Sequence, residues 1–149
     1  MQEIERSNQI INVRYGDGIM AIVIIEIEYH YYLMECPAFV AENITDYQQQ
    51  FDVWMSDKSN DHGYWGKHEP QEYFAEKGMP DPYNMGRDPD GKDFLAYGED
   101  AFVDWLNRFV LQDKSEKAKI ISTHHIDERN EKGHAIFPNE FSEYPHIFY

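Results

Sequence analysis

The longest alternating run of apolar residues lies near the N-terminus, at residues 19–35, IMAIVIIEIEYHYYLME. Side chains two apart in a strand point to one face, and those counted from Ala21 are all apolar or aromatic. They are Ala21, Val23, Ile25, Ile27, Tyr29, Tyr31 and Leu33. The opposite face is apolar as far as Ile24 and then polar, with Glu26, Glu28 and His30. This pattern predicts one strand that is buried on both faces first and is open to solvent on one face later.

A strand over residues 19–35 would be about 55 Å long, roughly three times the usual length, so we expect a bend near residues 28–30. Residues 9–15 also have strand character, and Gly16-Asp17-Gly18 between the two runs predicts an antiparallel hairpin. Cys36-Pro37 should end the pairing, because proline has no amide hydrogen to donate.

Apolar residues at helical spacing predict helices over residues 44–57 and 100–111. Residues 117–123, KAKIIST, read as a strand. Residues 134–137 and 146–149 are further strand candidates, and residues 130–133 would form a turn before the first of these.

Residues 58–95 contain most of the glycine and proline together with many aromatic residues. Flexible linkers lack aromatic residues, so we predict a long ordered loop pinned by its own rings. It should contain one short helix that ends at Gly78. Such a loop either has a function or covers an edge or face of the sheet.

The predicted fold is α+β. It has a mostly antiparallel sheet built on a long N-terminal hairpin, two main helices on one face and the aromatic loop. With 149 residues, a single domain over 1–149 is expected. The lone Cys36 excludes an internal disulfide. The polar N-terminus does not have the pattern of a signal peptide, and no apolar run approaches the ~20 residues that span a bilayer. We therefore expect a cytoplasmic protein that does not bind membranes.

Charge narrows the choice of partners. The chain has 28 Asp and Glu against 13 Lys and Arg, a formal net charge of −15, which argues against direct binding of nucleic acid. Between Arg14 and Lys58 there is no Lys or Arg, so eight carboxylates give this interval a net charge of −8. They are Asp17, Glu26, Glu28, Glu35, Glu42, Asp46, Asp52 and Asp57. Such a field attracts cationic partners, although it could equally serve solubility.

Two groups of residues have the chemistry of a site. The segment His124-His125-Ile126-Asp127, with His134 nearby, contains metal-ligating residue types, and in a strand His125 and Asp127 would share a face. The spacing matches no metal signature, and such residues are commonly surface residues, so we predict no metal and no cofactor.

Glu26, Glu28 and His30 on the polar face of the strand could perform acid–base chemistry if a cleft enclosed them. The alternative is a solvated sheet face. The chain contains no nucleophile motif, phosphate-binding loop or dinucleotide-binding motif, which favours a binding protein over an enzyme.

The remaining signal is acidity combined with aromatic residues in a loop, a mixture that suits capture of a basic protein. The carboxylates would be Glu26, Glu28, Asp46, Asp52 and Asp57, and the aromatic contacts would be Tyr64 and Trp65. In size and charge alone, the chain is similar to immunity proteins of bacterial toxins and to phage anti-restriction or anti-CRISPR inhibitors. This similarity implies an inhibitor of a basic, nucleic-acid-acting partner. The alternative is a small metal- or ligand-binding enzyme that uses His124, His125 and Asp127 or the Glu26, Glu28 and His30 face.

Overall fold

The computed structural model describes residues 13–15, 18–67, 72–79, 82 and 91–149. It combines helices with a mostly antiparallel sheet, so the predicted α+β class is confirmed. The chain divides into two compact units, one formed by residues 1–51 and 98–149 and the other by residues 52–97. The single domain over residues 1–149 stays a prediction.

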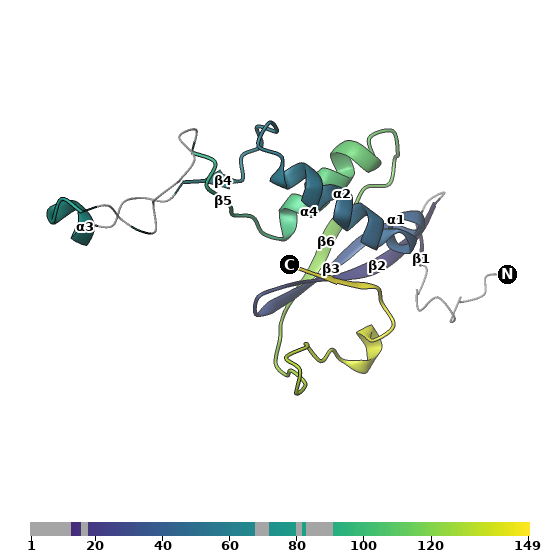
Figure 1. The fold of residues 1–149 in the computed structure, drawn as a ribbon. Helices are drawn as coiled ribbons and strands as arrows, with labels where there is room; N and C mark the ends of the chain where they lie inside the picture. Colours follow the sequence, from purple (N-terminus) through teal and green to yellow (C-terminus); the bar gives the residue numbers. More distant parts are fainter. Residues whose placement is uncertain (1–12, 16–17, 68–71, 80–81, 83–90) are drawn as a thin grey trace. The chain divides into compact units, whose positions relative to one another are not determined.

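The sheet of the first unit has five strands (Figure 1). Its order is β1 (Val13–Tyr15), β2 (Gly18–Ile27), β3 (His30–Pro37) and β6 (Lys119–His125), and β7 (His146–Phe148) also pairs with β2. All pairings are antiparallel except that of β7 with β2, which is parallel. The predicted pairing of the first two strands is therefore confirmed, although residues 9–12, 16 and 17 lie outside the described residues.

The prediction of one strand over residues 19–35 is wrong. The chain reverses at Glu28 and Tyr29, and β2 and β3 form a hairpin in which Ile27 pairs with His30. Glu28 has φ 55°, the left-handed conformation that two-residue hairpin turns require. The expected bend is thus a complete turn, and it changes which odd-numbered residues share a face. Ile25 now pairs with Tyr32 instead of lying on the same face as Tyr31.

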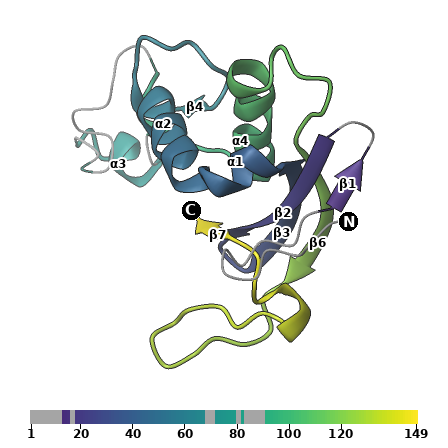
Figure 2. The ribbon, with the colours of Figure 1, turned by 90° about the vertical axis from the view of Figure 1, so that its right-hand side faces the viewer.

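Three helices cover one face of the sheet (Figures 1 and 2). They are α1 (Ala38–Glu42), the first part of α2 (Ile44–Ser56) and α4 (Glu99–Trp105). The ring of Phe51 on α2 lies 5.3 Å from that of Phe102 on α4, and both side chains are buried. The predicted placement of the two main helices on one face is confirmed.

The segment after β6 covers the opposite face of the sheet (Figure 2). There the strands contribute the buried side chains of Ile22, Ile24, Tyr31 and Leu33. Ile126 joins this cluster from the covering segment, and partly buried rings pack against it. These rings are Phe137, Phe141, which lies in the short 3-10 helix η2 (Asn139–Phe141), and Tyr144. The sheet is therefore a central layer with apolar packing on both sides.

Helix α4 continues as a π-helix, η1 (Leu106–Val110), in which the amide of Leu111 donates to the carbonyl of Leu106 over 2.8 Å. The wider turn shifts the side chains around the helix axis. Leu111 is fully buried and Phe109 is 46% exposed. The side-chain amide of Asn107 donates to and accepts from the backbone of Ala118, which attaches this turn to the chain leading into β6.

The second unit contains part of the predicted aromatic loop. Strands β4 (Trp65–Gly66) and β5 (Phe94–Leu95) form a small antiparallel pair, and α3 (Glu72–Glu76) is the predicted short helix. Gly78 follows α3 with φ +64°, as a helix-ending glycine does. Among the described helices, none is both long enough and apolar enough to cross a lipid bilayer.

Candidate protein-binding surface

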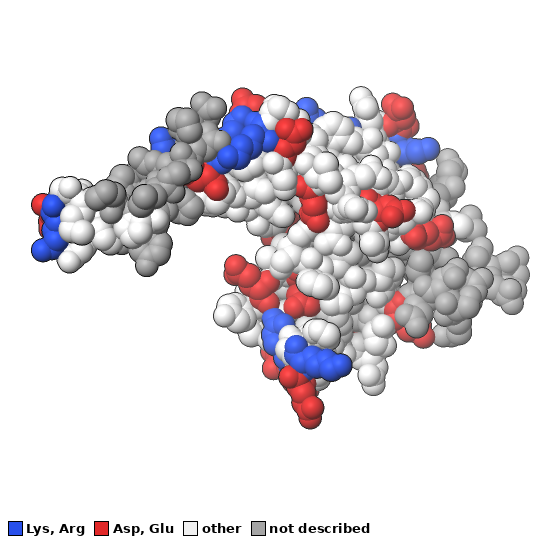
Figure 3. Space-filling model, viewed as in Figure 1, with Lys and Arg blue, Asp and Glu red and all other residues white. Residues whose placement is uncertain are grey.

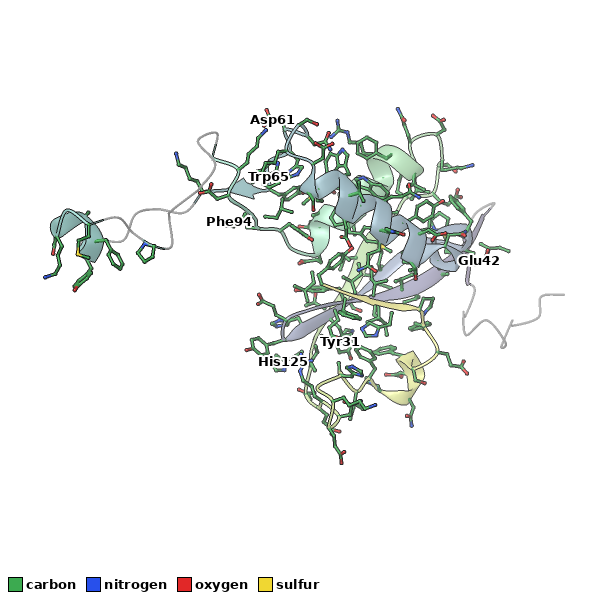
Figure 4. All side chains as sticks on the ribbon, in the orientation of Figure 1. Tyr31, Glu42, Asp61, Trp65, Phe94 and His125 are labelled. Atoms are coloured by element: carbon green, nitrogen blue, oxygen red, sulfur yellow. The ribbon has the colours of Figure 1, made fainter. Side chains whose placement is uncertain are left out.

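Residue Asn43 shapes the surface formed by α1 and α2. Pro37 ends β3 and precedes α1, and after the five residues of α1 Asn43 interrupts the helix. The Asn43 side-chain amide donates to the carbonyl of Phe39 over 2.8 Å, and the Asn43 carbonyl accepts from the amide of Tyr47 over 3.1 Å. Asn43 therefore supplies hydrogen-bonding partners both to the last turn of α1 and to the first turn of α2. The inner side chains of these helices are buried, whereas Glu42, which Figure 4 labels, and Asp46 are exposed.

The charges on these helices are not neutralised locally. Residues 38–57 contain no Lys or Arg. Within the part of the chain that the structure describes, the carboxylates of Glu42 and Asp46 form no ion pair. Asp46 lies in the first turn of α2, where a negative charge also stabilises the helix dipole. Figure 3 shows acidic side chains standing singly over α1 and α2, separated by uncharged surface.

Helix α1 also carries an exposed apolar ring next to a cavity. The ring of Phe39 on α1 is 36% exposed, and the Lys114 ammonium lies 5.8 Å from its centre. Beside it is a mostly apolar cavity of about 320 Å³, lined by Ile19, Met20, Pro37, Ala38, Phe39, Lys114 and Glu116. We call Phe39, Glu42, Asp46 and this cavity the α1–α2 surface. Protein-binding patches commonly combine an apolar centre with a charged rim in this way.

Nothing in the sequence singles out Glu42, because the apolar spacing predicts no helix before residue 44. The acidic run from Arg14 to Lys58 includes this residue, but its exposure depends on the short helix α1. Phe39 follows Pro37 in the sequence, and no pattern there distinguishes an exposed ring from a buried one.

Asp52 and Asp57, the other predicted partner-binding acids of this run, belong to the second unit, and both are exposed. Although the residue as a whole is exposed, partial burial of its carboxyl group raises the pKa of Asp52. The pKa of Asp57 is lowered, because its Oδ1 accepts hydrogen bonds from the hydroxyl of Ser59 over 2.7 Å and from the Ser59 amide over 2.9 Å. The Asp57 carboxylate is thus held in its charged form.

The predicted aromatic contacts, Tyr64 and Trp65, are half-buried. The ring of Trp65 stacks on His62 with 5.2 Å between centres, and its Nε1 donates to the carbonyl of Asn60 over 3.1 Å. His62 Nδ1 accepts from the amide of Tyr64, so its Nε2 carries the proton and donates to the carbonyl of Met55 over 2.9 Å. These contacts bind the loop to the end of α2, and the role of the two rings in partner binding stays a prediction.

Trp65 and Phe94 lie on the paired strands β4 and β5 (Figure 4). A Cβ added to Gly66 would come within 2.5 Å of the Phe94 ring, so this position has room only for glycine unless the ring moves. The close approach shows how the loop is held by its own rings.

Glu26, also predicted to bind a partner, is engaged inside the first unit. Its Oε1 lies 3.0 Å from His146 Nε2 and its Oε2 lies 3.2 Å from Arg129 Nη1. Arg129 also donates to the carbonyl of Glu28 over 2.6 Å and to that of Gly133 over 2.9 Å. The Glu26 carboxylate is therefore satisfied by groups of its own chain and does not belong to the α1–α2 surface. Glu28 itself is exposed in the hairpin turn.

The structure does not bring Glu26, Glu28 and His30 together on one face of a strand, as the long-strand prediction required. Glu26 pairs with Tyr31 on one face, Glu28 lies in the turn, and His30 pairs with Ile27 on the other face. The reason is the two-residue turn, which reverses the chain between Glu26 and His30. Their predicted acid–base arrangement is therefore corrected.

The two adjacent histidines of the predicted metal-ligating segment point to opposite faces of β6. His124 stacks on Tyr31 with 4.8 Å between ring centres, and its Nε2 lies 2.9 Å from the Ser122 hydroxyl. His125 and Asp127 are close, with 3.4 Å between Nδ1 and Oδ1, as the sequence suggests. His134 is exposed in the following loop. No group of three or more His, Cys, Asp or Glu residues that could hold a metal is found among the described residues.

Comparison of the chain with protein-family models, with curated proteins and with solved structures finds no match. Helices α1 and α2 offer exposed carboxylates, and α1 adds an exposed ring next to a cavity, a combination typical of protein-binding surfaces.

Proposed function

We propose that the protein binds a cationic protein through the α1–α2 surface. The observation that carries this proposal is the exposure of Glu42 and Asp46 without an ion pair in the described part of the chain. A basic partner would supply the missing counter-charges. Asp52, Asp57 and Glu28 are further exposed carboxylates that would add to the attraction.

A partner of this kind would recognise both charge and shape. Long-range attraction by a chain of net charge −15 would raise the rate of encounter. Short-range binding would come from an apolar side chain of the partner that enters the cavity beside Phe39, with Lys or Arg residues around it facing Glu42 and Asp46.

Enzymes that act on nucleic acids present basic surfaces to phosphate groups. An acidic protein that occupies such a surface would block access of the nucleic acid. We therefore propose a small inhibitor, comparable in role to toxin-immunity or anti-restriction proteins, that acts in the cytoplasm.

The test uses two matched double variants that each remove two negative charges. Glu42→Gln with Asp46→Asn neutralises the α1–α2 surface, and Glu128→Gln with Glu131→Gln neutralises two exposed acids of the segment after β6. Amide replacements are chosen because a lysine at Asp46 would oppose the helix dipole of α2. Each protein is immobilised, and proteins bound from an extract of the native host are identified and quantified.

We expect the wild type and the Glu128/Glu131 variant to capture the same basic protein, and the Glu42/Asp46 variant to capture at least about tenfold less. Equal capture by both variants would show that the α1–α2 surface is not the binding site. Capture only of acidic proteins by the wild type would contradict the proposed class of partner.

A further inference from the structure

Two histidines face each other across neighbouring strands, on the face of the sheet on which the helices pack. His30 on β3 and His125 on β6 are direct partners in the antiparallel pairing. Both side chains are exposed, His125 by 63%. Their ring centres lie 5.3 Å apart, and the ring planes stand at 87° to each other. His125 and Tyr31, which marks the neighbouring position of β3, lie towards one end of the sheet in Figure 4.

This separation fits two imidazoles bound to one metal ion. With a metal–nitrogen distance of about 2.1 Å and a tetrahedral angle, two coordinated rings have centres about 5 Å apart. Facing positions on antiparallel strands hold the two Cβ atoms at about 5 Å, so the strands fix the distance before any ion binds. Rotation of the rings about their side-chain bonds can then direct one nitrogen of each at a common point.

Asp127 defines which nitrogen of His125 is available. Its Oδ1 lies 3.4 Å from His125 Nδ1, and because a carboxylate only accepts hydrogen bonds, Nδ1 is the donor. Nε2 of His125 then carries the lone pair. A carboxylate that orients a histidine in this way is the usual outer partner of a metal-bound imidazole.

The remaining described histidines of the first unit are placed differently. His124 points to the other face and stacks on Tyr31. His146 contacts the Glu26 carboxylate over 3.0 Å. His134 lies beyond the strand in an exposed turn, where its amide donates to Asn130 Oδ1. The facing pair His30 and His125 is therefore distinguished by the strand register and not by a general abundance of histidine.

We propose that His30 and His125 bind one divalent transition-metal ion of the imidazole-preferring kind, such as Ni²⁺, Cu²⁺ or Zn²⁺. Two imidazole nitrogens form the protein ligands, Asp127 orients His125, and the remaining coordination positions are open to water or to a ligand from another molecule. The acidic character of the chain favours approach of a cation. This proposal does not depend on the α1–α2 surface.

The test measures Ni²⁺ binding to the untagged full chain by calorimetry, for the wild type and for His30→Gln and His125→Gln. The matched controls are His124→Gln, one residue away on the opposite face, and His134→Gln. Because Ni²⁺ is paramagnetic, line broadening of backbone amide resonances locates the ion in the same samples. Thermal unfolding followed by circular dichroism verifies that each variant is folded.

We expect one Ni²⁺ per chain, with broadening centred on residues 30 and 125. His30→Gln and His125→Gln should each weaken binding at least about tenfold, because each leaves a single imidazole. The two controls should bind Ni²⁺ as the wild type does. Absence of binding to the wild type, unchanged binding by His30→Gln and His125→Gln, or broadening centred elsewhere would overturn the proposal.

Discussion

The Cys36 thiol is fully buried at the end of β3, and its chemistry follows from this position. Burial raises the pKa of Cys36 to about 12, a change that the carboxylate of Glu35 increases and a backbone hydrogen bond from Ala41 opposes. The thiolate is the reactive form of cysteine. We therefore expect the native protein to be inert to iodoacetamide at about pH 8, where an exposed thiol of ordinary pKa reacts.

The measurement is mass spectrometry of alkylated Cys36 with and without urea. Rapid alkylation of the folded protein would contradict the burial of the thiol.

The raised pKa of the Cys36 thiol also has a consequence for stability. The unfolded thiol ionises near pH 8.5, whereas the native thiol stays protonated to about pH 12, so Cys36 lowers the free energy of unfolding as pH rises through this window.

Side-chain contacts in the candidate sites were predictable only where they form between residues close in sequence. The proximity of His125 and Asp127 follows from alternation along a strand. The residue that faces His125 cannot be predicted in this way, because the pairing of β3 with β6 brings His30 opposite it. Similarly, nothing in the sequence around Glu26 indicates that Arg129 and His146, more than a hundred residues away, would contact its carboxylate.

At the scale of elements, the β2–β3 hairpin depends on bonds from a distant segment. Glu28 adopts a positive φ that is unfavourable for a residue with a side chain. The turn is held by Arg129, which donates to the Glu28 carbonyl, and by the amide of Ile126, which donates to the Tyr29 carbonyl over 2.8 Å. The contacts that hold the turn thus lie about a hundred residues away in the chain.

We expect Arg129→Ala to lower the free energy of unfolding by about 1–2 kcal/mol, because it removes charge-assisted hydrogen bonds to Glu26 and Glu28 from a half-exposed site. Lys132→Ala removes the same charge from an exposed position of the same loop and should change the free energy by less than about 0.5 kcal/mol. Urea unfolding measures both. Equal stability of the two variants would mean that Arg129 does not stabilise the hairpin.

These long-range bonds explain which elements the sequence predicts. Helix α2 and the short helix α3 have their own apolar spacing or end signals, and both are confirmed. The two turn positions are occupied by Glu28 and Tyr29 and not by the Gly or Asn that such turns prefer. The sequence therefore reads as one continuous strand through the turn. The parallel pairing of β7 with β2 also escapes prediction, because it depends on where the segment after β6 crosses the sheet. Residues 134–137, a strand candidate, contribute only a single bridge between Arg129 and Ala135.

At the scale of the whole molecule, the α+β class follows from the sequence because apolar alternation and helical spacing occur in separate stretches. The distribution of charge was only partly predictable. Of the carboxylates between Arg14 and Lys58, Glu26 and Glu35 lie in the sheet and contact basic residues, Glu35 through Lys119 at 3.7 Å. Those on α1 and α2 stay exposed. The fold thus pairs some of these carboxylates with basic residues and leaves others exposed. The net charge of the sequence alone does not show which carboxylates form the acidic surface.

The central claim is that this unpaired acidity captures a basic protein. The most direct measurement is the association rate constant between the chain and its captured partner at ionic strengths from about 0.01 to 0.15 M. The account predicts a fall of about tenfold or more for the wild type and for the Glu128/Glu131 variant, and a clearly smaller fall for the Glu42/Asp46 variant. Rates that do not depend on salt, or that depend on it equally in all three proteins, would contradict it.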